Sequence, residues 1–186
     1  IKNDPAVPAH ACVYCLNFAN INLSDISYVV FYDKPFLKFE RLIESYYHHA
    51  PKGLKSFLTS MPIWLKDKLH IKKIIKKELK KLFPSDTKHS FELLFSDHHL
   101  SHAASAYYVS PFPSAAILTI DGVGEWTTTG IFKGEDANIT MLKELHYPDS
   151  LGLLYSSFTY FLGFKVNSGE YKMMGLAPYG DKDATE

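Results

Sequence analysis

The spacing of apolar residues along the chain predicts strands that alternate with helices. Continuous apolar and β-branched runs are typical of strands buried on both faces, and they occupy residues 26–32, 91–95 and 115–121. Helical periodicity fills much of the remaining chain, at residues 8–19, 36–50, 53–61, 62–83, 98–109, 151–164 and 168–178. Pro62 is expected to open the longest of these helices, because proline is tolerated in a first helical turn.

Two further segments predict an antiparallel hairpin. Residues 127–133 and 139–146 have the composition of strands and flank a turn at residues 134–138. Residues 84–90 are polar and are expected to form a linker. Strands that alternate with helices, together with one hairpin, place the chain in the α/β class.

Two serines and one glutamate are predicted to lie at the N-termini of helices. Ser150 and Ser168 precede predicted helices and are expected to be N-caps, because a serine hydroxyl can accept a hydrogen bond from the first helical turn. Glu170 falls in the first turn of the last helix, where its negative charge complements the helix dipole.

Composition and charge narrow the possible partners. The 186 residues are 46% hydrophobic and 15% aromatic, which is enough for a packed core. The 20 basic residues balance the 20 acidic ones, so we expect neither nucleic acid nor membrane as a partner. The balance hides an asymmetry, since residues 1–90 hold 15 basic and 8 acidic side chains and residues 91–186 hold 5 and 12. Only two cysteines are present, which excludes a disulfide framework and makes a cytoplasmic location the default expectation.

Cys12 and Cys15 have the C-x-x-C spacing of zinc knuckles and redox pairs. Zinc would need two further ligands at suitable spacing, and a redox pair usually begins a helix that follows a strand. The sequence provides neither context. We therefore interpret both cysteines as small core residues of a helix.

The lysine-rich stretch 72–81 could form a nucleic-acid patch. Its lysines interleave with Ile74, Ile75 and Leu79, which is the pattern of an amphipathic helix with a solvated face. Proteins that read nucleic acids also favour arginine, and Arg41 is the only arginine of the chain. The solvated face is the favoured interpretation.

A metal site is indicated by two histidines and an aspartate. His98 and His102 are four residues apart on a predicted helix, so both imidazoles project from one side and can share a metal. Asp121 follows at the end of a predicted strand, where open α/β sheets place ligands. Two imidazoles and one carboxylate leave coordination positions free, which suits Fe(II) or Zn(II). Without the histidines, Asp121 would be equally well explained as a turn residue before Gly122.

Glycine-rich segments indicate a second kind of site, one that contacts phosphate or another anion. Gly122 and Gly124 form a turn after Asp121 that can bring backbone N–H groups close to phosphate oxygens, although plain hairpin turns have the same spacing. Lys172 lies on a glycine-rich predicted helix whose N-terminus could face an anion. Tight packing of that helix on the sheet is the alternative.

The chain resembles a known family, the O-carbamoyltransferases of the nodulation and antibiotic-tailoring type. The resemblance rests on the motifs YDKPFLKFERL (32–42), HHLSHAASAYYVSPF (98–112), AAILTIDGVGEW (115–126) and SLGLLYSSFTYFLGFKVNSGEYKMMGLAPYG (150–180). It implies that residues 1–186 are an incomplete N-terminal domain of the actin-like ATPase superfamily, Kae1-like and ribonuclease H-like. It also implies a first strand before Ile1 and a C-terminal YrdC-like domain after Glu186.

The resemblance further implies an activity. In this family the YrdC-like domain makes carbamoyl-adenylate from carbamoyl phosphate and ATP, and the Kae1-like domain passes the carbamoyl group to a hydroxyl of a sugar or antibiotic-like acceptor. The implied roles are iron ligands for His98, His102 and Asp121, with His102 and Asp121 as catalytic residues, and nucleotide contacts for Gly122, Gly124, Ser150, Leu151, Gly152, Glu170 and Lys172. A further metal ligand is expected beyond Glu186, so the fragment is expected to be inactive alone.

Two other functions stay open at this point. A metal-dependent hydrolase could use the same two histidines and aspartate to activate water. A non-catalytic nucleotide-binding scaffold could instead dock a partner through its lysine-rich helix. Within the carbamoyltransferase hypothesis, Asp121 could hold the metal or deprotonate the acceptor hydroxyl. An absent first strand would leave a sheet edge uncovered, so a homo-oligomer is also an expectation.

Overall fold

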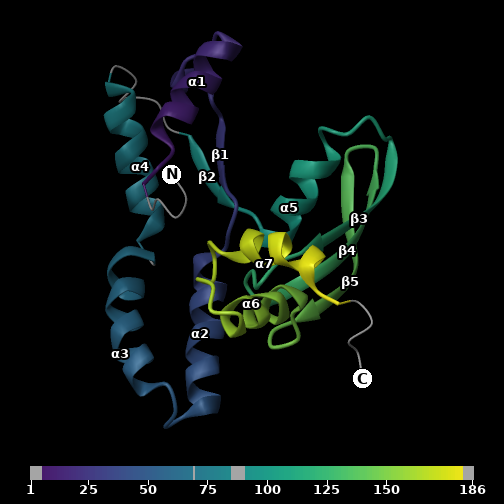
Figure 1. Cartoon of the computed structure of the whole chain (residues 1–186). Helices are drawn as coiled ribbons and strands as arrows, with labels where there is room; N and C mark the ends of the chain where they lie inside the picture. Colours follow the sequence, from purple (N-terminus) through teal and green to yellow (C-terminus); the bar gives the residue numbers. More distant parts are fainter. Residues whose placement is uncertain (1–5, 69, 85–90, 182–186) are drawn as a thin grey trace. The chain divides into compact units, whose positions relative to one another are not determined.

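A computed structural model describes residues 6–68, 70–84 and 91–181, which fall into two compact units, one ending at Ser96 and the other beginning at Asp97 (Figure 1). The first unit contains α1 (Ala9–Ala19), η1 (Leu23–Asp25), β1 (Tyr28–Phe31), α2 (Pro35–His49), α3 (Leu54–Ile63), η2 (Trp64–Lys68), α4 (Ile71–Leu82) and β2 (Glu92–Phe95). The second contains α5 (His98–Tyr107), β3 (Ser114–Ile120), β4 (Thr127–Glu135), β5 (Asn138–His146), α6 (Leu151–Phe161), α7 (Glu170–Leu176) and η4 (Ala177–Tyr179).

The first unit is built on the parallel pair β1 and β2. Helix α4 covers this pair with Ile75 and Leu79, which lie four residues apart and are buried together with Phe91 and Leu93. The lysines of α4 alternate with these apolar positions and remain in solvent or at the border of the core. The lysine run is therefore a solvated helix face, as predicted.

Strand β1 is covered on one face only, and its residues there are half-buried, whereas the sequence predicted burial on both faces. Val29 and Phe31 pack against the core cluster of α4 and β2, but Tyr28 and Val30 are each 60% exposed. An apolar run predicts two covered faces only when helices lie on both sides of the sheet. Here a two-stranded sheet carries its packed helix α4 on the side of Val29 and Phe31.

Pro62 does not open a helix, which corrects the prediction made for it. It lies inside α3, one residue before the end of that helix at Ile63. Proline has no N–H to donate to the preceding turn, and the helix passes at this point into the wider π-helical turn η2. The predicted helix 62–83 is therefore two segments, η2 and the separate helix α4. Most of the predicted linker, residues 85–90, lies outside the described part of the chain.

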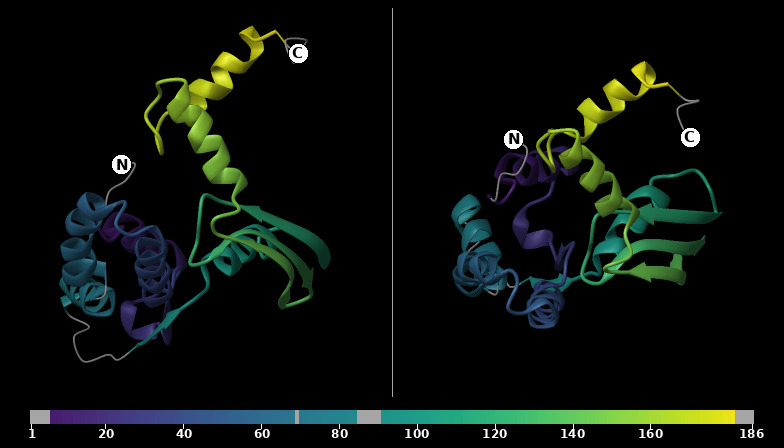
Figure 2. Two further views of the ribbon diagram at one scale, coloured as in Figure 1. Left: turned by 90° about the horizontal axis from the view of Figure 1, so that it is seen from below. Right: turned by 60° about the horizontal axis from the view of Figure 1, so that its bottom comes forward.

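The second unit is an antiparallel sheet in the order β3-β4-β5, with α5 packed on one face (Figure 2). Its core consists of Ala103 and Tyr107 from α5, Ile117 from β3 and Phe132 from β4. The predicted hairpin is confirmed as β4 and β5. Its turn is tighter than predicted, because both strands extend to the two-residue connection that begins at Asp136, whose φ is 52°.

The sequence predicted β3 as a strand buried on both faces, and this is wrong for the same reason as in β1. Leu118 and Ile120 are exposed on the face opposite to Ile117. Alternation along the strand nevertheless gives a definite inward face, and that face carries the residues that meet α5.

One of the two predicted N-caps is confirmed and the other is wrong. Ser150 is the N-cap of α6, and its hydroxyl accepts the N–H of Leu153 at 3.0 Å, as predicted. Ser168 is not the N-cap of α7, because the helix begins at Glu170 and Gly169 occupies the cap position. The Glu170 carboxylate is in the first turn, where it accepts the N–H of Asn167.

We predict that Phe132→Ala lowers the free energy of unfolding by about 3–5 kcal/mol, because the ring is 1% exposed at the centre of the second unit. Ile131→Ala is the matched control on the same strand, where the side chain is 42% exposed and should cost less than about 1 kcal/mol. Chemical denaturation of both variants measures the difference. Equal losses would contradict the assignment of Phe132 to the core.

Candidate metal centre

Helix α5 presents two neighbouring faces. His99, Ala103 and Tyr107 recur every four residues and are buried against the sheet. His98 and His102 each precede one of these positions by one residue and so lie on the adjacent face. Their ring centroids are 4.7 Å apart, which is the juxtaposition that the spacing of four residues predicts.

Strand β3 places Asp121 on the same side of the sheet as α5. Ile117 and Thr119 point toward the helix, and Asp121 continues their alternation one position beyond the strand. Its backbone N–H still donates to the carbonyl of Thr128 on β4, at 2.9 Å. The carboxylate is therefore carried by backbone that the sheet holds in register.

A buried hydrogen bond connects the helix to this strand. His99 Nδ1 lies 2.7 Å from the hydroxyl of Thr119, and both side chains are buried. Because His99 adjoins His98 and Thr119 is two residues before Asp121, the bond sets the position of the helix relative to the end of β3.

Glu125 supports the start of the helix from the turn that follows β3. Its side chain is buried, and its carboxylate accepts the backbone N–H of His98 at 3.1 Å. The first N–H groups of a helix have no partner within the helix, and a carboxylate there also complements the helix dipole. Glu125 thereby links the turn that begins at Asp121 to the residue that bears the first imidazole.

Close backbone packing requires glycine at two places in this region. A Cβ on Gly124 would lie 3.0 Å from His99 Cδ2 and 3.1 Å from His98 Cβ, so the turn passes directly against the first residues of α5. A Cβ on Gly152 would lie 2.4–2.6 Å from the backbone of Asp121 and Gly122. The N-terminus of α6 therefore rests on the peptide that follows the aspartate.

Ser150 fixes the same peptide from the N-cap position of α6. Its hydroxyl donates toward the carbonyl of Gly122, at 2.6 Å, with the carbonyl of Asp121 also near at 3.2 Å. The hydroxyl accepts the N–H of Leu153 at the same time. One serine thus caps α6 and joins it to the turn that carries the aspartate.

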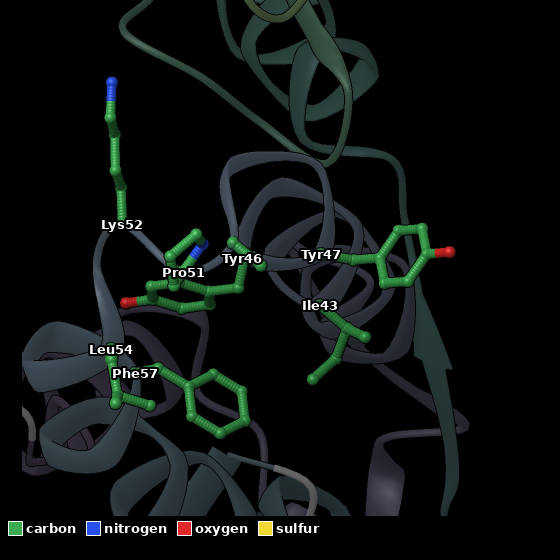
Figure 3. Close-up of a pocket in the computed structure, with 8 residues that line it drawn as sticks. Ile43, Tyr46, Tyr47, Pro51, Lys52, Leu54 and Phe57 are labelled. Carbon is green, nitrogen blue, oxygen red and sulfur yellow. The ribbon is translucent and has the colours of Figure 1, made fainter.

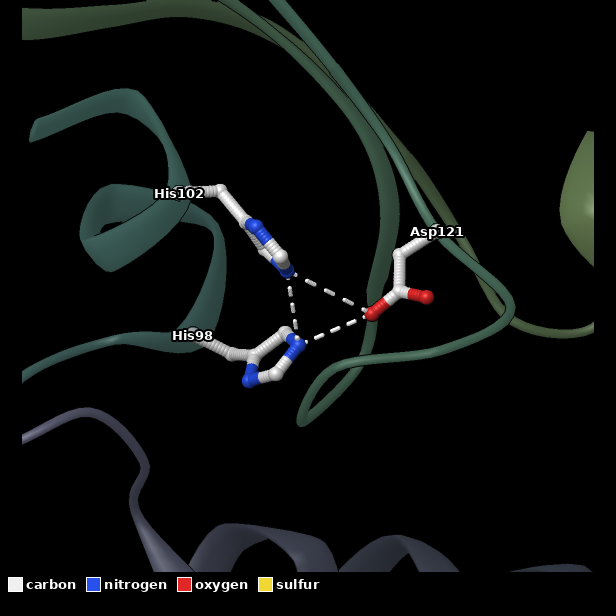
Figure 4. A group of neighbouring side chains, drawn as sticks. All are labelled: His98, His102 and Asp121. Atoms are coloured by element: carbon white, nitrogen blue, oxygen red, sulfur yellow. Dashed lines mark hydrogen bonds and ion pairs between the residues drawn. The ribbon is translucent and has the colours of Figure 1, made fainter. Parts of the chain in front are cut away.

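His98, His102 and Asp121 meet with three atoms directed at a common point (Figure 4). His98 Nε2 lies 2.8 Å from Asp121 Oδ2 and 3.1 Å from His102 Nε2, and His102 Nε2 lies 3.6 Å from Asp121 Oδ2. The side chain of His98 is 13% exposed, while those of His102 and Asp121 are 50% and 38% exposed. The cluster is anchored on the buried side and open on the other.

The electrostatics of the cluster favour the ionised form of the Asp121 carboxylate. The hydrogen bond from His98 is the main cause that lowers the pKa of Asp121 well below its ordinary value. The N–H of Gly122 and the two imidazoles act in the same direction and burial acts against them. Burial lowers the pKa of His99, and the neighbouring histidines add to this effect. His99 is therefore a neutral ring at pH 7.

The three residues fit a divalent metal ion. Ligand atoms bound at about 2.0–2.2 Å are separated by roughly 3.0 Å at right angles and roughly 3.4 Å in a tetrahedron, and the three observed separations of 2.8, 3.1 and 3.6 Å bracket these values. A single proton on His98 Nε2 cannot point straight at both His102 and Asp121, so hydrogen bonds through that proton cannot satisfy all three atoms. A cation at the common point would remove this conflict. Two imidazoles and a carboxylate suit Fe(II) or Zn(II) with open positions.

The other predicted site residues divide into two groups. Four of them, Gly122, Gly124, Ser150 and Gly152, lie in or against the turn that carries Asp121. Leu151 begins α6 beside them. Glu170 and Lys172 lie on α7, which is joined to α6 by the hydroxyl of Tyr155 at 3.4 Å from the carbonyl of Glu170. No contact described for these two residues connects them to Asp121, so their nucleotide role stays a prediction.

Sequence reasoning missed the residues that support the centre. Thr119, Glu125 and the buried His99 act through contacts between elements that are distant along the chain. Glu125 carried no usable signal, because a carboxylate in a glycine turn is usually exposed and its burial here depends on contact with α5. Thr119 carried none, because threonine is ordinary in a strand.

The two cysteines and a cavity belong to the first unit. Cys12 and Cys15 are free thiols on α1, half-buried and exposed, so the prediction of two core residues is wrong. An apolar cavity of about 320 Å³ lies between α2 and α3. Figure 3 shows Tyr46, Pro51 and Phe57 around it, with the Lys52 side chain directed away. Its lining carries no carboxylate or imidazole.

Within residues 6–68, 70–84 and 91–181, no helix combines the length and apolar character that crossing a bilayer requires.

The fold is mixed α/β, and its cluster of two histidines and one aspartate could hold a metal ion. The family model Carbamoyltransferase N-terminus matches residues 1–186, and the chain therefore belongs to this family. The resemblance seen in the motifs is thereby confirmed.

Three relatives align with the chain. The chain is 53% identical over 180 residues to the uncharacterized protein sll1178 of Synechocystis sp., a match that covers 97% of this chain and 29% of that protein. It is 36% identical over 184 residues to the nodulation protein NolNO of Sinorhizobium fredii, covering 97% of this chain and 24% of that protein. It is 40% identical over 121 residues to the uncharacterized protein MJ1058 of Methanocaldococcus jannaschii, covering 57% of this chain and 19% of that protein. The chain spans less than a third of the length of these curated relatives.

We predict that the chain binds Co(II), a spectroscopic substitute for Fe(II) and Zn(II), and that His102→Ala weakens binding by more than about 100-fold. Losing one of three ligands should cost more than the 10–100-fold typical of losing a supporting partner. Visible absorption during a Co(II) titration measures the affinity. His49→Ala is the control, because His49 is an exposed histidine whose Nδ1 bonds the carbonyl of Ser45. Equal affinity in both variants would contradict the site.

We also predict that Gly152→Ala destabilises the second unit by about 1–3 kcal/mol, because the new Cβ would meet backbone atoms that cannot move aside. Gly175→Ala on α7 is the control. A Cβ there meets nothing within 4 Å, so the change should be neutral or stabilise by up to about 1 kcal/mol. Thermal unfolding of the two variants separates these outcomes. A stable Gly152→Ala variant would show that α6 does not rest on the Asp121 peptide.

Proposed function

We propose that this chain is the part of a carbamoyltransferase in which an activated carbamoyl group is passed to a hydroxyl of a small-molecule acceptor. The observation that carries the proposal is the convergence of His98, His102 and Asp121 within 4.8 Å, in a chain that belongs to the carbamoyltransferase N-terminus family. The open side of the cluster supports binding of a substrate next to the three side chains.

The residues of the chain have separate tasks in this proposal. His98 and His102 would hold a divalent ion, Fe(II) in the first instance, through their Nε2 atoms, and Asp121 would hold it through Oδ2. When bound, the ion supplies Lewis-acid stabilisation of negative charge on the carbamoyl carbonyl or on the leaving phosphate. Glu125 and Thr119 keep the two elements in register, so the site is rigid before substrate arrives.

The remaining donor chemistry is assigned to the rest of the protein. We propose that carbamoyl phosphate and ATP give carbamoyl-adenylate in a YrdC-like domain, and that the present chain is part of a Kae1-like domain of the actin-like ATPase superfamily. The glycine turn at Gly122 and Gly124 and the N-terminus of α6 at Ser150, Leu151 and Gly152 would contact the nucleotide. Support for this comes from their packing around Asp121. The chain alone would then be inactive.

The proposal extends to the acceptor and the cellular setting. The acceptor would be a sugar or antibiotic-like molecule that offers a hydroxyl. A cytoplasmic setting is supported by two free thiols, because such thiols persist in reducing compartments.

The test is His102→Ala in the full-length protein, assayed in two ways. We expect transfer of the carbamoyl group to an acceptor to fall by more than about 100-fold, while carbamoyl phosphate-dependent exchange between ATP and pyrophosphate stays within about 3-fold of wild type. The reason is that the imidazole belongs to the transfer site. His49→Ala is the control for both assays.

Three results would decide against parts of this account. Loss of both activities in a folded variant would place the metal in adenylate formation as well. No change in either activity would make His102 a structural residue. A wild-type protein that only hydrolyses carbamoyl phosphate, with no transfer to any acceptor, would favour the metal-dependent hydrolase.

A further inference from the structure

The acceptor hydroxyl must lose a proton during carbamoyl transfer, and Asp121 is poorly placed to take it. Its Oδ2 contacts His98 and His102, and its Oδ1 accepts the N–H of Gly122 at 2.7 Å. These contacts occupy both oxygens of the carboxylate and hold the cluster together. Another group is therefore required.

A second polar cluster lies at the same end of the sheet. His146, the last residue of β5, contacts Glu144 with Nε2 at 3.1 Å from Oε2. The hydroxyl of Thr127, the first residue of β4, donates to the same oxygen at 2.5 Å. The side chain of His146 is 53% exposed, so the imidazole can be reached from solvent.

The strand register places this cluster on the face of the sheet that carries the metal centre. Thr119 is paired with Gly130, and Gly130 with Glu144, so Thr119 and Glu144 share one cross-strand row. Thr119 points toward α5, where it bonds His99. Glu144 therefore points to that side as well.

The two clusters are also close along the sheet edge. Asp121 N–H bonds Thr128 O, and the neighbouring Thr127 is paired with His146. Two strand spacings thus separate the backbones of Asp121 and His146, which is roughly 10 Å. A small acceptor bound at the open side of the metal centre can span this separation.

The contact with Glu144 determines which nitrogen of His146 carries the proton. A carboxylate oxygen can only accept, so Nε2 is the protonated nitrogen and Nδ1 is left with a lone pair. Within the described part of the chain, Nδ1 has no hydrogen-bond partner. Burial alone would raise the pKa of Glu144, but the bonds from Thr127 and His146 and the nearby imidazoles lower it, so the carboxylate stays ionised. An imidazole oriented by an ionised carboxylate is the usual arrangement of a general base.

We propose that His146, oriented by Glu144, is the general base that takes the proton of the acceptor hydroxyl, a role that rests on the proposed carbamoyl transfer. As the acceptor oxygen forms its bond to the carbamoyl carbon, its proton moves to His146 Nδ1. The bond between that carbon and the leaving phosphate or AMP oxygen breaks, and the electron pair stays on the leaving group. The imidazolium then releases its proton to solvent, while Glu144 stabilises the positive charge.

The test uses the full-length protein with two probes, glycerol and hydroxylamine, each supplied with carbamoyl phosphate and ATP. Glycerol must lose a hydroxyl proton as it attacks, whereas hydroxylamine is already an unprotonated nucleophile at pH 7.5. For His146→Gly we expect carbamoylation of glycerol to fall by about 100-fold or more and that of hydroxylamine by less than about 5-fold. Added imidazole should restore glycerol transfer at least about 10-fold, a rescue that a purely structural residue would not show.

Two further variants test whether the loss of glycerol transfer depends on the pair of Glu144 and His146. Glu144→Gln should lower glycerol transfer by about 10-fold, because the imidazole loses its orienting charge. Glu135→Gln is the matched control on the same hairpin, where the carboxylate pairs with Lys133 at 2.8 Å, and it should match wild type. Co(II) affinity should be unchanged in all three variants. A loss of transfer would then come from the loss of the base and not from the loss of the metal.

The outcomes are distinguishable. Equal losses with both probes and no rescue by imidazole would overturn the role of His146 and leave carbamoyl transfer standing. A wild-type enzyme that carbamoylates neither probe above the enzyme-free rate would overturn the proposed function, and the general base would fall with it.

Discussion

The contact between His98 and Asp121 is the constraint on which the rest of the centre depends. It joins a helix to the end of a strand across 23 positions of sequence, and its 2.8 Å length leaves little tolerance in the placement of either element. Helix α5 must therefore lie against β3 and β4 at one defined position along the strands. Tyr107 and Ala103 provide the apolar part of that packing, and the bond between His99 and Thr119 gives it a direction that apolar contact alone does not have.

The turn after β3 has to be fixed as firmly as the helix. Its far side receives the N-terminus of α6, where Ser150 bonds the turn and Gly152 allows direct backbone contact. Its near side passes under the first residues of α5 at Gly124. The turn is thus held between two helices, and Gly124 is explained by this close packing even before any phosphate is considered. A nucleotide role for the same residues would make use of a geometry that the fold already needs.

Part of this architecture could be predicted from the sequence. The spacing of His98 and His102 predicts their shared face, because it follows from the period of one helix, and Asp121 could be placed because an acid that ends a strand lies at the edge of a sheet. Glu125 and Thr119 could not, since their partners are set by how separate elements pack. The apolar runs of β1 and β3 led to a wrong prediction, burial on both faces. Each strand is covered on one face only, because burial depends on how many layers of helices pack on the sheet and not on the strand itself.

The central claim is that His98, His102 and Asp121 jointly bind one divalent ion. X-ray absorption spectroscopy at the metal edge, on full-length protein loaded with Fe(II), tests this most directly. We expect nitrogen and oxygen ligands at about 2.0–2.2 Å together with the outer scattering of two imidazoles, reduced to one imidazole in the His98→Ala variant. Sulfur ligands near about 2.3 Å, or a spectrum without imidazole scattering, would contradict the claim.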